Sequence, residues 1–256
     1  MKGMLLAAGL GTRLKPFTEK HPKALFPVNG KSLLQRNIEY LQSFGVKDVI
    51  VNVHHFSDQI IEEVKHNNGW GSKIFISDET NDVLETGGGL KKAAHFFKDN
   101  VEPFVLMNAD ILTDLDLNKM KEQHIKHAPL ATLAVTDRST SRYLLYNGNN
   151  ILCGWLNEKT GEQKGKQGIK KAFSGVHIIS PDIFSLIKEE GKFSMIDLYL
   201  RLANDHTILA FDHSETKFID VGKMDSVADA EKMFGGSPIL SEGEGNCGDR
   251  SEETFT

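Results

Sequence analysis

Short apolar runs alternate along the chain with segments in which apolar residues recur every three or four positions. The segment from Asp58 to Asn67 has the second pattern, with Ile60, Ile61 and Val64 on one side of a helix and charged residues on the other. Apolar runs between polar segments predict buried strands. The predicted strands are Gly3–Ala8, Asp48–Val53, Lys73–Ser77, Phe104–Asn108, Ala131–Thr136, Ala172–Ile179, Thr207–Asp212 and Lys217–Val221. The predicted helices are Leu33–Phe44, Asp58–Asn67, Gly88–Lys98, Leu117–His127, Pro181–Glu190, Met195–Asn204 and Ser226–Phe234.

The alternation of strands and helices predicts an α/β fold with a mixed sheet. In the first half it implies right-handed βαβ units and therefore a mainly parallel sheet. The pattern runs through residues 1–234 and suits one domain, whereas residues 235–256 are rich in Gly, Ser and Glu and predict a disordered tail. Because ligands bind beyond the carboxyl ends of parallel strands, we expect the chemistry just after Ala8, Val53, Asn108 and Val221.

Composition and charge narrow the classes of function. The 256 residues are 39% hydrophobic and 25% charged, which is typical of a soluble globular protein. The net charge of −5 argues against a nucleic-acid-binding protein. The two cysteines have no metal-site spacing, and the apolar run Met4–Ala8 is too short for a signal peptide. No run has the length of a membrane helix, so we expect a cytoplasmic protein without a membrane partner.

A glycine-rich loop follows the first strand, in the string LAAGLGTRLKP. Gly9 and Gly11 allow a sharp turn and a close approach to a ligand, and successive N–H groups in such a turn can hold an anion. Arg13 adds a planar cation suited to phosphate oxygens. A dinucleotide-binding loop is excluded because Leu14 stands where its third glycine would be. The run GKS from Gly30 is only a turn and a helix start, because Leu25 replaces the first glycine of a P-loop.

Two aspartates stand at the ends of predicted strands. Asp110 ends FVLMNAD, and Asp220 ends KFID. Two carboxylates with phosphate and water form the set that Mg²⁺ prefers, so both are candidate ligands of Mg²⁺. Asp114, Asp116 and Asp225 are predicted to cap helices.

The ten histidines form no motif that would compete with this metal site. His54 and His55 are adjacent, so on a strand their side chains would face opposite sides. His124 and His127 share one helix face but no carboxylate completes the pair. We therefore expect all ten to be exposed or in loops.

The whole string LAAGLGTRLKPFTEKHPKALFPVNGKSLL resembles the motif of the sugar-1-phosphate nucleotidyltransferase family. The family pattern G-x-G-x-R, L-x-P-x-T, P-K is matched by Gly9, Gly11, Arg13, Leu14, Pro16, Thr18, Pro22 and Lys23. Asp110 and Asp220 match the two metal-binding aspartates of the family, with Ala109 where glycine is common. The likeness extends from Met1 to about Phe234. It implies a single three-layer α/β/α, Rossmann-like and GT-A-like domain that binds Mg²⁺.

The resemblance also implies roles for individual residues. Arg13 would hold the β- and γ-phosphates, Lys23 the α-phosphate and the sugar phosphate, and Asp110 would be catalytic through the metal. The residues implied in nucleotide binding are Leu6, Ala7, Ala8, Gly9, Gly11, Thr12, Arg13 and, in a second glycine-rich loop, Glu85, Thr86, Gly87 and Gly88. Those implied in sugar binding are Asn108, Ser174, Gly175 and Lys159, with Lys170 and Lys171 as alternatives to Lys159.

The resemblance implies a reaction between two anionic substrates. A nucleoside triphosphate (NTP) would transfer its nucleoside monophosphate to a sugar 1-phosphate and release pyrophosphate. The motifs LETGGG, FSG and FIDVG look most like those of N-acetylmuramate-1-phosphate uridylyltransferases, which favours UTP, a role in cell-wall recycling, and a monomer or homodimer. Mannose- or heptose-1-phosphate guanylyltransferases share most motifs and stay open as alternatives. Two further alternatives are a non-catalytic nucleotide-sugar-binding regulatory subunit, which usually lacks some of the four charged residues, and cytidylyl transfer to a phosphorylated alcohol.

Overall fold

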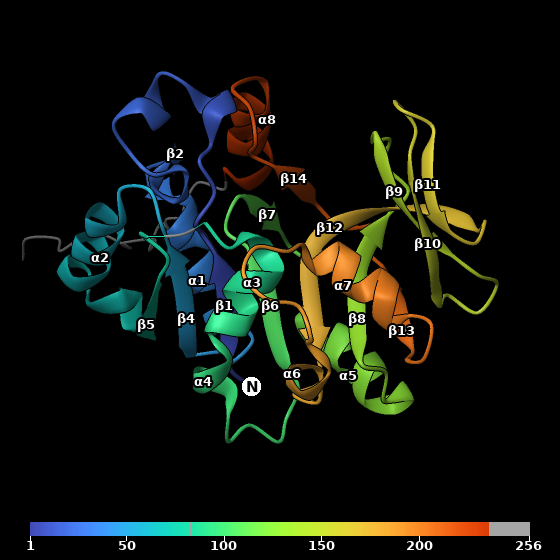
Figure 1. Cartoon of the computed structure of the whole chain (residues 1–256). Helices are drawn as coiled ribbons and strands as arrows, with labels where there is room; N and C mark the ends of the chain where they lie inside the picture. The colour runs from blue at the N-terminus through green and yellow to red at the C-terminus, as the bar shows by residue number, and fades with distance from the viewer. Residues whose placement is uncertain (82, 236–256) are drawn as a thin grey trace, which may run out of the picture.

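The computed structural model describes residues 1–81 and 83–235, and the tail predicted at residues 235–256 lies almost wholly outside these. A ten-stranded mixed sheet crosses the molecule in the order β11-β10-β9-β12-β6-β1-β4-β5, with β8 beside β12 and β13 beside β8 (Figure 1). The pairs of β1 with β4 and β6, of β4 with β5, and of β8 with β13 are parallel. The strands are β1 (Gly3–Leu6), β4 (Asp48–Val53), β5 (Lys73–Asp78), β6 (Phe104–Asn108), β8 (Ala131–Thr136), β9 (Arg142–Tyr146), β10 (Leu152–Asn157), β11 (Glu162–Gly165), β12 (Ile169–Ile179) and β13 (Ile208–Asp212).

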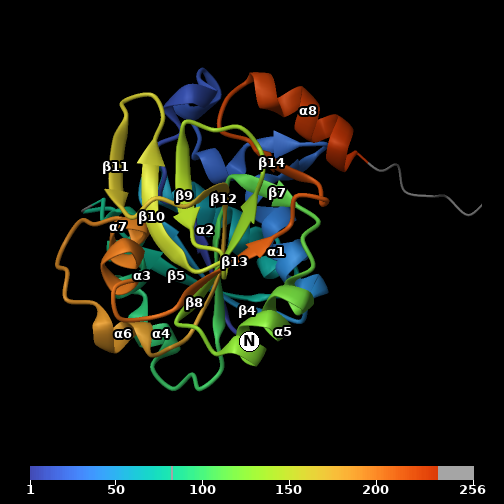
Figure 2. The same cartoon turned by 90° about the vertical axis from the view of Figure 1, so that its right-hand side faces the viewer.

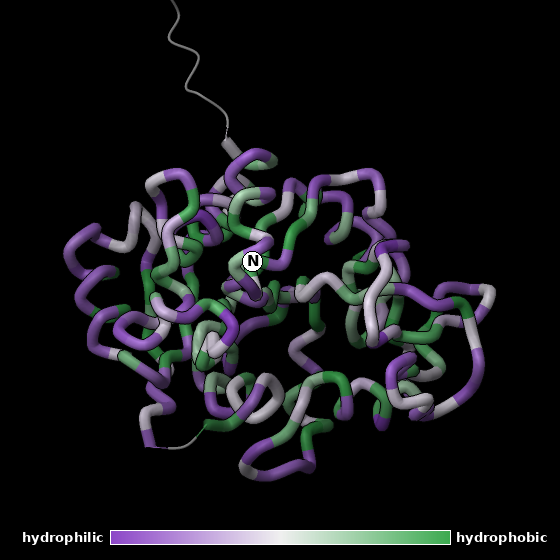
Figure 3. The backbone as a smooth tube through the Cα atoms, turned by 90° about the horizontal axis from the view of Figure 1, so that it is seen from above, coloured by the Kyte–Doolittle hydropathy of each residue, from purple (hydrophilic) through white to green (hydrophobic). Residues whose placement is uncertain are grey.

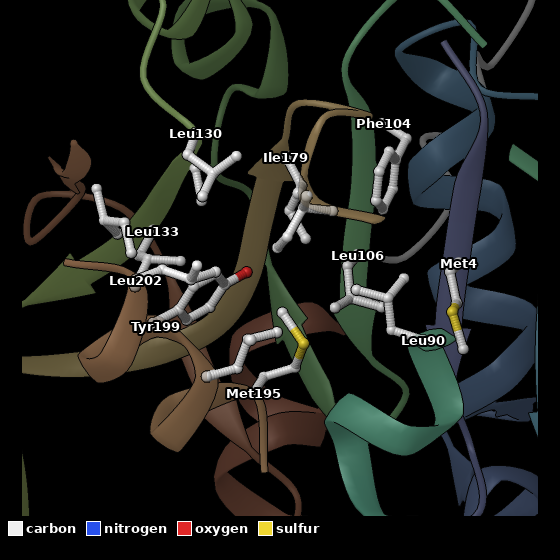
Figure 4. Close-up of a cluster of buried hydrophobic side chains, with 14 of the residues drawn as sticks. Met4, Leu90, Phe104, Leu106, Leu130, Leu133, Ile179, Met195, Tyr199 and Leu202 are labelled. Carbon is white, nitrogen blue, oxygen red and sulfur yellow. The ribbon is translucent and has the colours of Figure 1, made fainter. Parts of the chain in front are cut away.

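Helices cover both faces of the sheet, as a three-layer fold requires (Figure 2). Met4 and Leu106 pack with α3, α4, α6 and α7 on one face, and Figure 4 shows the side chains of Leu106 and Leu90 meeting there. Leu5 and Val105 pack with α1, α2 and α5 on the other. Successive residues of a strand point to opposite faces, so strands buried on both sides read as continuous apolar runs. The helices are α1 (Leu33–Ser43), α2 (Ser57–His66), α3 (Glu85–Lys92), α4 (Ala94–Phe97), α5 (Leu117–His127), α6 (Ile183–Leu186) and α7 (Met195–Leu202).

A smaller apolar cluster lies beyond the carboxyl ends of the parallel strands. It joins Leu14 and Val28 near the N-terminus to Leu112, Val221 and Ala230. Seen from above, hydrophobic segments concentrate in the interior and hydrophilic segments at the periphery (Figure 3). The smaller cluster fixes the chain segments that surround the carboxyl end of β1. Its elements are β2 (Pro27–Val28), β3 (Lys31–Ser32), β7 (Ile111–Thr113), β14 (Phe218–Asp220), α8 (Asp225–Phe234) and the 3₁₀ turns Thr12–Leu14, Phe17–Glu19 and Lys23–Leu25, with a further 3₁₀ turn at Asn68–Gly71.

The predicted strands are all present, but the strands β9, β10 and β11 were missed. They build an antiparallel extension of the sheet, and all four residues of β11 are exposed, so no apolar pattern marks it. The predicted helix Pro181–Glu190 is reduced to Ile183–Leu186. Arg201 binds both carboxylate oxygens of Glu189, at 2.6 and 2.9 Å, which holds residues after Leu186 outside the helix. Among the described residues, no helix has the length and apolar character needed to cross a bilayer.

Three histidines are buried. His124 on α5 and His177 on β12 contradict the expectation that all ten are exposed or in loops, whereas His213 lies in the loop after β13. His124, His177 and His213 are at most 4% exposed, and each has a hydroxyl within hydrogen-bonding distance. Burial lowers the pKa of His124 to about 4, of His177 to about 3 and of His213 to about 4. These imidazoles are therefore neutral in the folded chain at neutral pH.

We expect the free energy of unfolding to fall as the pH drops below about 6.5, the ordinary histidine pKa. The unfolded chain then takes up protons that the folded chain does not, so stability rises with pH across this range and falls toward acid. Each histidine contributes up to about 1.4 kcal/mol per pH unit until its folded pKa is reached. Denaturant unfolding at about pH 7 and about pH 5 measures the loss.

The variant His124→Gln supplies the control for this pH dependence. Glutamine can keep a hydrogen bond to Thr132 but does not titrate, so the loss of stability between the two pH values should shrink by about one third. An unchanged loss in this variant would show that His124 is not a source of the pH dependence.

Candidate active site

The loop after β1 is held by one hydrogen bond to the distant strand β4 and by one to a nearby residue of the same stretch. The N–H of Ala7 donates to Oδ1 of Asn52 on β4, at 2.7 Å. The hydroxyl of Thr18 donates to the carbonyl of Gly11, at 2.9 Å. Gly11 has a φ of 60°, and a Cβ there would lie 2.8 Å from Cβ of Lys23, so both its conformation and its surroundings require glycine. A Cβ on Gly9 would meet no atom within 4 Å, so this part of the loop borders open space.

Lys23 and the two predicted metal ligands come together at the carboxyl end of β6. Nζ of Lys23 donates to Oδ2 of Asp110 at 2.5 Å, and only 10% of the lysine side chain is exposed. Asp110 follows β6, and Asp220 ends β14, which pairs with β7. The N–H of Val221 donates to the carbonyl of Asp110 at 2.8 Å, so Asp110 and Asp220 lie on adjacent backbone segments.

Arg13 reaches the same place from the glycine loop. A Cβ built on Gly222 would lie 2.6 Å from Oδ1 of Asp220 and 2.9 Å from Nη2 of Arg13. The carboxylate and the guanidinium therefore both abut Gly222, where any side chain would displace them. The structure thus gathers two cations and two carboxylates from four separate segments around one site.

The charges around Asp220 suit a divalent cation. The pKa of its carboxyl is raised, first because surrounding protein atoms exclude solvent and second because the negative charge of Asp110 is close. Lys23, Arg13 and Arg138 oppose this shift. No donor among residues 1–81 and 83–235 forms a hydrogen bond with the Asp220 side chain. Two neighbouring carboxylates, one without a protein donor, match the few oxygen ligands that Mg²⁺ takes beside phosphate. In the described part of the chain no third acid, histidine or cysteine completes a metal cluster.

A cavity of about 280 Å³ opens beside these charges. It lies between the loop after β1, the end of β6 and the start of α3. The predicted residues Gly11, Thr12, Arg13, Gly87 and Gly88 do not line it. The predicted residues that do are Leu6, Ala7, Ala8, Gly9, Lys23, Glu85, Thr86, Asn108 and Asp110.

The second glycine-rich segment is part of a helix and not a ligand-facing loop, which corrects the sequence-based interpretation. Gly87 and Gly88 both donate their N–H groups to the carbonyl of Phe193, at 2.9 and 3.3 Å. A Cβ on Gly87 would lie 2.4 Å from the Phe193 ring, and one on Gly88 2.3 Å from the carbonyl of Gly191. The lack of side chains at these glycines therefore leaves room for the segment before α7. Of the predicted residues in the glycine-rich segment, only Glu85 and Thr86 line the cavity.

The predicted sugar-binding residues separate into different places. Gly175 has a φ of 74° and abuts the Asn108 side chain, since a Cβ there would lie 2.7 Å from Nδ2. Its neighbour Ser174 is 1% exposed, and its hydroxyl lies 2.8 Å from Nε2 of His213, away from the cavity. Asn108 borders the cavity, so Gly175 shapes the site through it.

Lys159 does not line the cavity beside Lys23 and Asp110, nor a second cavity that borders the start of α3. It is exposed in the turn between β10 and β11. The alternatives are also engaged elsewhere: Lys170 binds Glu158 at 2.5 Å, and Lys171 pairs with Asp137 at 2.7 Å and with Asp212. The sequence therefore named three lysines but did not indicate Arg138, which lines the second of these cavities.

Two residues near the site were missed from the sequence. Asn52 is 2% exposed, lines the cavity and donates to the buried Glu79 at 2.9 Å. A polar residue inside the apolar run DVIVNV was the available signal for it. Arg138 lines a second cavity and donates to the carbonyl of Phe173 at 2.8 Å. Nothing local marks Arg138, because it stands in a polar loop after β8.

Of the three aspartates predicted to cap helices, only Asp116 does so. Its carboxylate accepts from the N–H groups of Asn118 and Lys119 at the start of α5. Asp114 instead accepts from the N–H of Lys217 at 2.7 Å. Asp225 is the first residue of α8, not its cap.

Comparison with known proteins identifies similar sequences. The sequence model of the nucleotidyl transferase family matches residues 2–235. Mannose-1-phosphate guanyltransferase 2 of Candida glabrata is 28% identical over 228 residues, covering 87% of this chain and 62% of the relative. N-acetylmuramate alpha-1-phosphate uridylyltransferase of Caulobacter vibrioides is 31% identical over 217 residues, covering 79% of this chain and 84% of the relative. The chain thus spans only about three fifths of the length of the first of these relatives.

The fold is also similar to that of solved structures. HddC from Yersinia pseudotuberculosis, in a crystal structure complexed with GMP-PN, superposes with a TM-score of 0.73 at 28% identity. The match covers 91% of this chain and 99% of that chain. The three-layer arrangement with a mixed sheet, parallel in its first half, therefore agrees with the sequence-based prediction.

Proposed function

This chain belongs to the nucleotidyl transferase family, and we propose that it transfers a nucleoside monophosphate from an NTP to a sugar 1-phosphate and releases pyrophosphate. The observation that carries the proposal is the meeting of Arg13, Lys23, Asp110 and Asp220 beside one cavity. All four are present, which disfavours the non-catalytic regulatory alternative. We propose residues 1–234 as the catalytic domain. The cytoplasmic location and the monomeric or homodimeric state stay predictions.

The protein's own residues act by positioning and by charge. Gly9 borders the cavity without a side chain, so the triphosphate can approach the backbone there. A sugar-phosphate oxygen forms the new bond to the α-phosphorus, and the bond from the α-phosphorus to the bridging oxygen breaks. Pyrophosphate leaves with that electron pair toward Arg13. Lys23 faces the negative charge that accumulates on the α-phosphoryl oxygens, and such charge stabilisation is the main term in catalysis of this kind.

Asp110 and Asp220 would hold Mg²⁺, whose chemistry in this site would be to neutralise phosphate oxygens. No protein base is needed, because a phosphate monoester has a second pKa of about 6 and is mostly ionised at neutral pH. The acids in the site are therefore free to act as ligands, and the two cations as partners of the phosphates.

For the substrates we propose UTP and N-acetylmuramate 1-phosphate. The motifs LETGGG, FSG and FIDVG support this pair, as does the Caulobacter vibrioides relative, of which the match covers 84%. GTP with mannose or heptose 1-phosphate is the second candidate. It is favoured by Glu85, which lines the cavity, because a glutamate carboxylate can accept the two adjacent N–H groups of guanine, whereas uracil offers one.

A panel of NTPs against a panel of sugar 1-phosphates, with pyrophosphate release as the readout, tests both the proposed reaction and the proposed substrates. We expect release with at least one pair and the highest kcat/KM with UTP and N-acetylmuramate 1-phosphate. Equal or better turnover with GTP and mannose 1-phosphate would contradict the substrates proposed but keep the reaction. No release with any pair would contradict the reaction itself.

The variant Glu85→Gln is expected to change base selection. A glutamine both donates and accepts, so it can meet the N3–H and O4 of uracil but can no longer accept both guanine N–H groups. The ratio of kcat/KM for UTP to that for GTP should rise about tenfold, the value of one charge-assisted hydrogen bond. The matched control is Glu190→Gln, because Glu190 is also an exposed glutamate paired with a lysine. A similar change in both variants would exclude contact between Glu85 and the base.

A further inference from the structure

A second cavity, of about 590 Å³, adjoins the first one. The two cavities share Glu85 and Thr86 in their linings, so both border the start of α3. Three cations line the second cavity: Arg138, Arg142 and Lys164. Lys164 is paired with Asp197 at 2.9 Å, which neutralises its charge. The two arginines form no ion pair with an acid within residues 1–81 and 83–235.

Two contacts hold the guanidinium of Arg138. Its Nη2 donates to the carbonyl of Phe173 on β12 at 2.8 Å. Its guanidinium lies 5.0 Å from the centre of the Phe218 ring, in a cation–π arrangement. Among the described residues, Phe173 is the only hydrogen-bond acceptor of this guanidinium, which has five N–H donors. The side chain is thus held in place while most of its donors stay available.

The contact with Phe218 sets Arg138 beside Asp220, one of the two aspartates proposed to bind the metal. Phe218 and Asp220 are both on β14 and are two residues apart, so their side chains point to the same face of the strand. A guanidinium stacked on Phe218 is therefore next to the Asp220 carboxylate. Arg138 is therefore the residue that connects the second cavity to Asp220.

We propose that Arg138 binds the phosphate of the sugar 1-phosphate and that the second cavity receives its sugar. This inference rests on the proposed function and names a binding residue that the motifs did not contain. The acceptor phosphate must reach the α-phosphorus near Lys23 and Asp110, and Arg138 is the cation that faces that point from the second cavity. A guanidinium can hold two phosphate oxygens at once and fix the direction of the attacking oxygen.

Steady-state kinetics of Arg138→Gln and Arg138→Lys, with the active pair from the substrate panel, tests the proposal. We expect Arg138→Gln to raise the KM for the sugar 1-phosphate about 10- to 100-fold, the effect of losing charge-assisted hydrogen bonds. The KM for the NTP should change less than about twofold, because Arg138 does not line the first cavity. Arg138→Lys should recover part of the lost affinity, since lysine restores the charge but not the planar pair of N–H donors of the guanidinium.

The variant Arg142→Gln is the matched control, because Arg142 lines the same cavity without the contact to Phe218. A larger rise in the sugar-phosphate KM for this variant than for Arg138→Gln would overturn the assignment. So would an equal rise in both substrates' KM values in Arg138→Gln, without recovery by lysine, because that pattern indicates a structural role.

Failure of the proposed reaction can be told apart from failure of this assignment by equilibrium binding. If no pair turns over, calorimetric titration with mannose 1-phosphate and N-acetylmuramate 1-phosphate compares the wild type, Arg138→Gln and Arg13→Gln. Binding that is weakened by Arg138→Gln and kept by Arg13→Gln supports the assignment even without turnover. Binding to the wild type that Arg138→Gln does not weaken, or no binding at all, overturns it.

Discussion

Replacing Asp110 by asparagine is expected to lower kcat about 10²- to 10³-fold while the protein stays folded. The amide has the size of the carboxylate, and the side chain is 32% exposed, so no cavity is created. What is lost is one of the two negative charges that would hold Mg²⁺, which would neutralise phosphate oxygens. The dependence of the rate on Mg²⁺ concentration should shift to higher concentration. Pyrophosphate release measured across a Mg²⁺ titration reports both effects.

The control for this variant is Asp116→Asn. Asp116 caps α5 and lines neither of the two cavities. This exchange should therefore change the free energy of unfolding by at most about 1 kcal/mol and leave turnover intact. If Asp110→Asn retained near-normal turnover with an unchanged Mg²⁺ dependence, Asp110 would have no part in metal binding or catalysis.

Replacing Lys23 by glutamine is expected to lower kcat by about 10²-fold or more. Its ammonium is almost buried and lies 2.5 Å from Asp110, so its charge acts with little screening by solvent. In the transition state this charge would face the α-phosphoryl oxygens, a contact that glutamine replaces only with a neutral donor. The loss should therefore fall mainly on kcat, with a smaller change in the KM for the NTP.

Lys20→Gln is the matched control, because Lys20 is exposed three residues earlier in the same segment. Its turnover should stay within about twofold of the wild type, since exposed charges are screened. The double variant of Lys23 and Asp110 should lose less than the two single losses combined, because the residues contact each other. Full additivity, or normal turnover of Lys23→Gln, would contradict a shared role at one phosphate.

Local patterns in the sequence were sufficient for most of the fold. The parallel strands β4 and β6 and the helix α5 were predicted with their observed bounds, because strands buried on both faces and amphipathic helices each leave a periodic signal. The exposed strand β11 and the shortened α6 leave no such signal. Their conformations depend on strand pairing with β10 and on the contact between Arg201 and Glu189, which join residues distant in the chain or in different elements.

The sequence by itself determined the glycine loop after β1 and the identity of the charged residues, because a continuous motif and strand-end aspartates can be recognised without coordinates. Only the tertiary structure decided that Asp110 and Asp220 lie on adjacent backbone segments, that Gly87 and Gly88 make room for the segment from Gly191 to Phe193, and that Arg138 packs on the Phe218 ring. Each of these depends on packing between segments far apart in the chain. Local periodicity carries no information about such contacts, since they form only when sheet order and register bring the segments together.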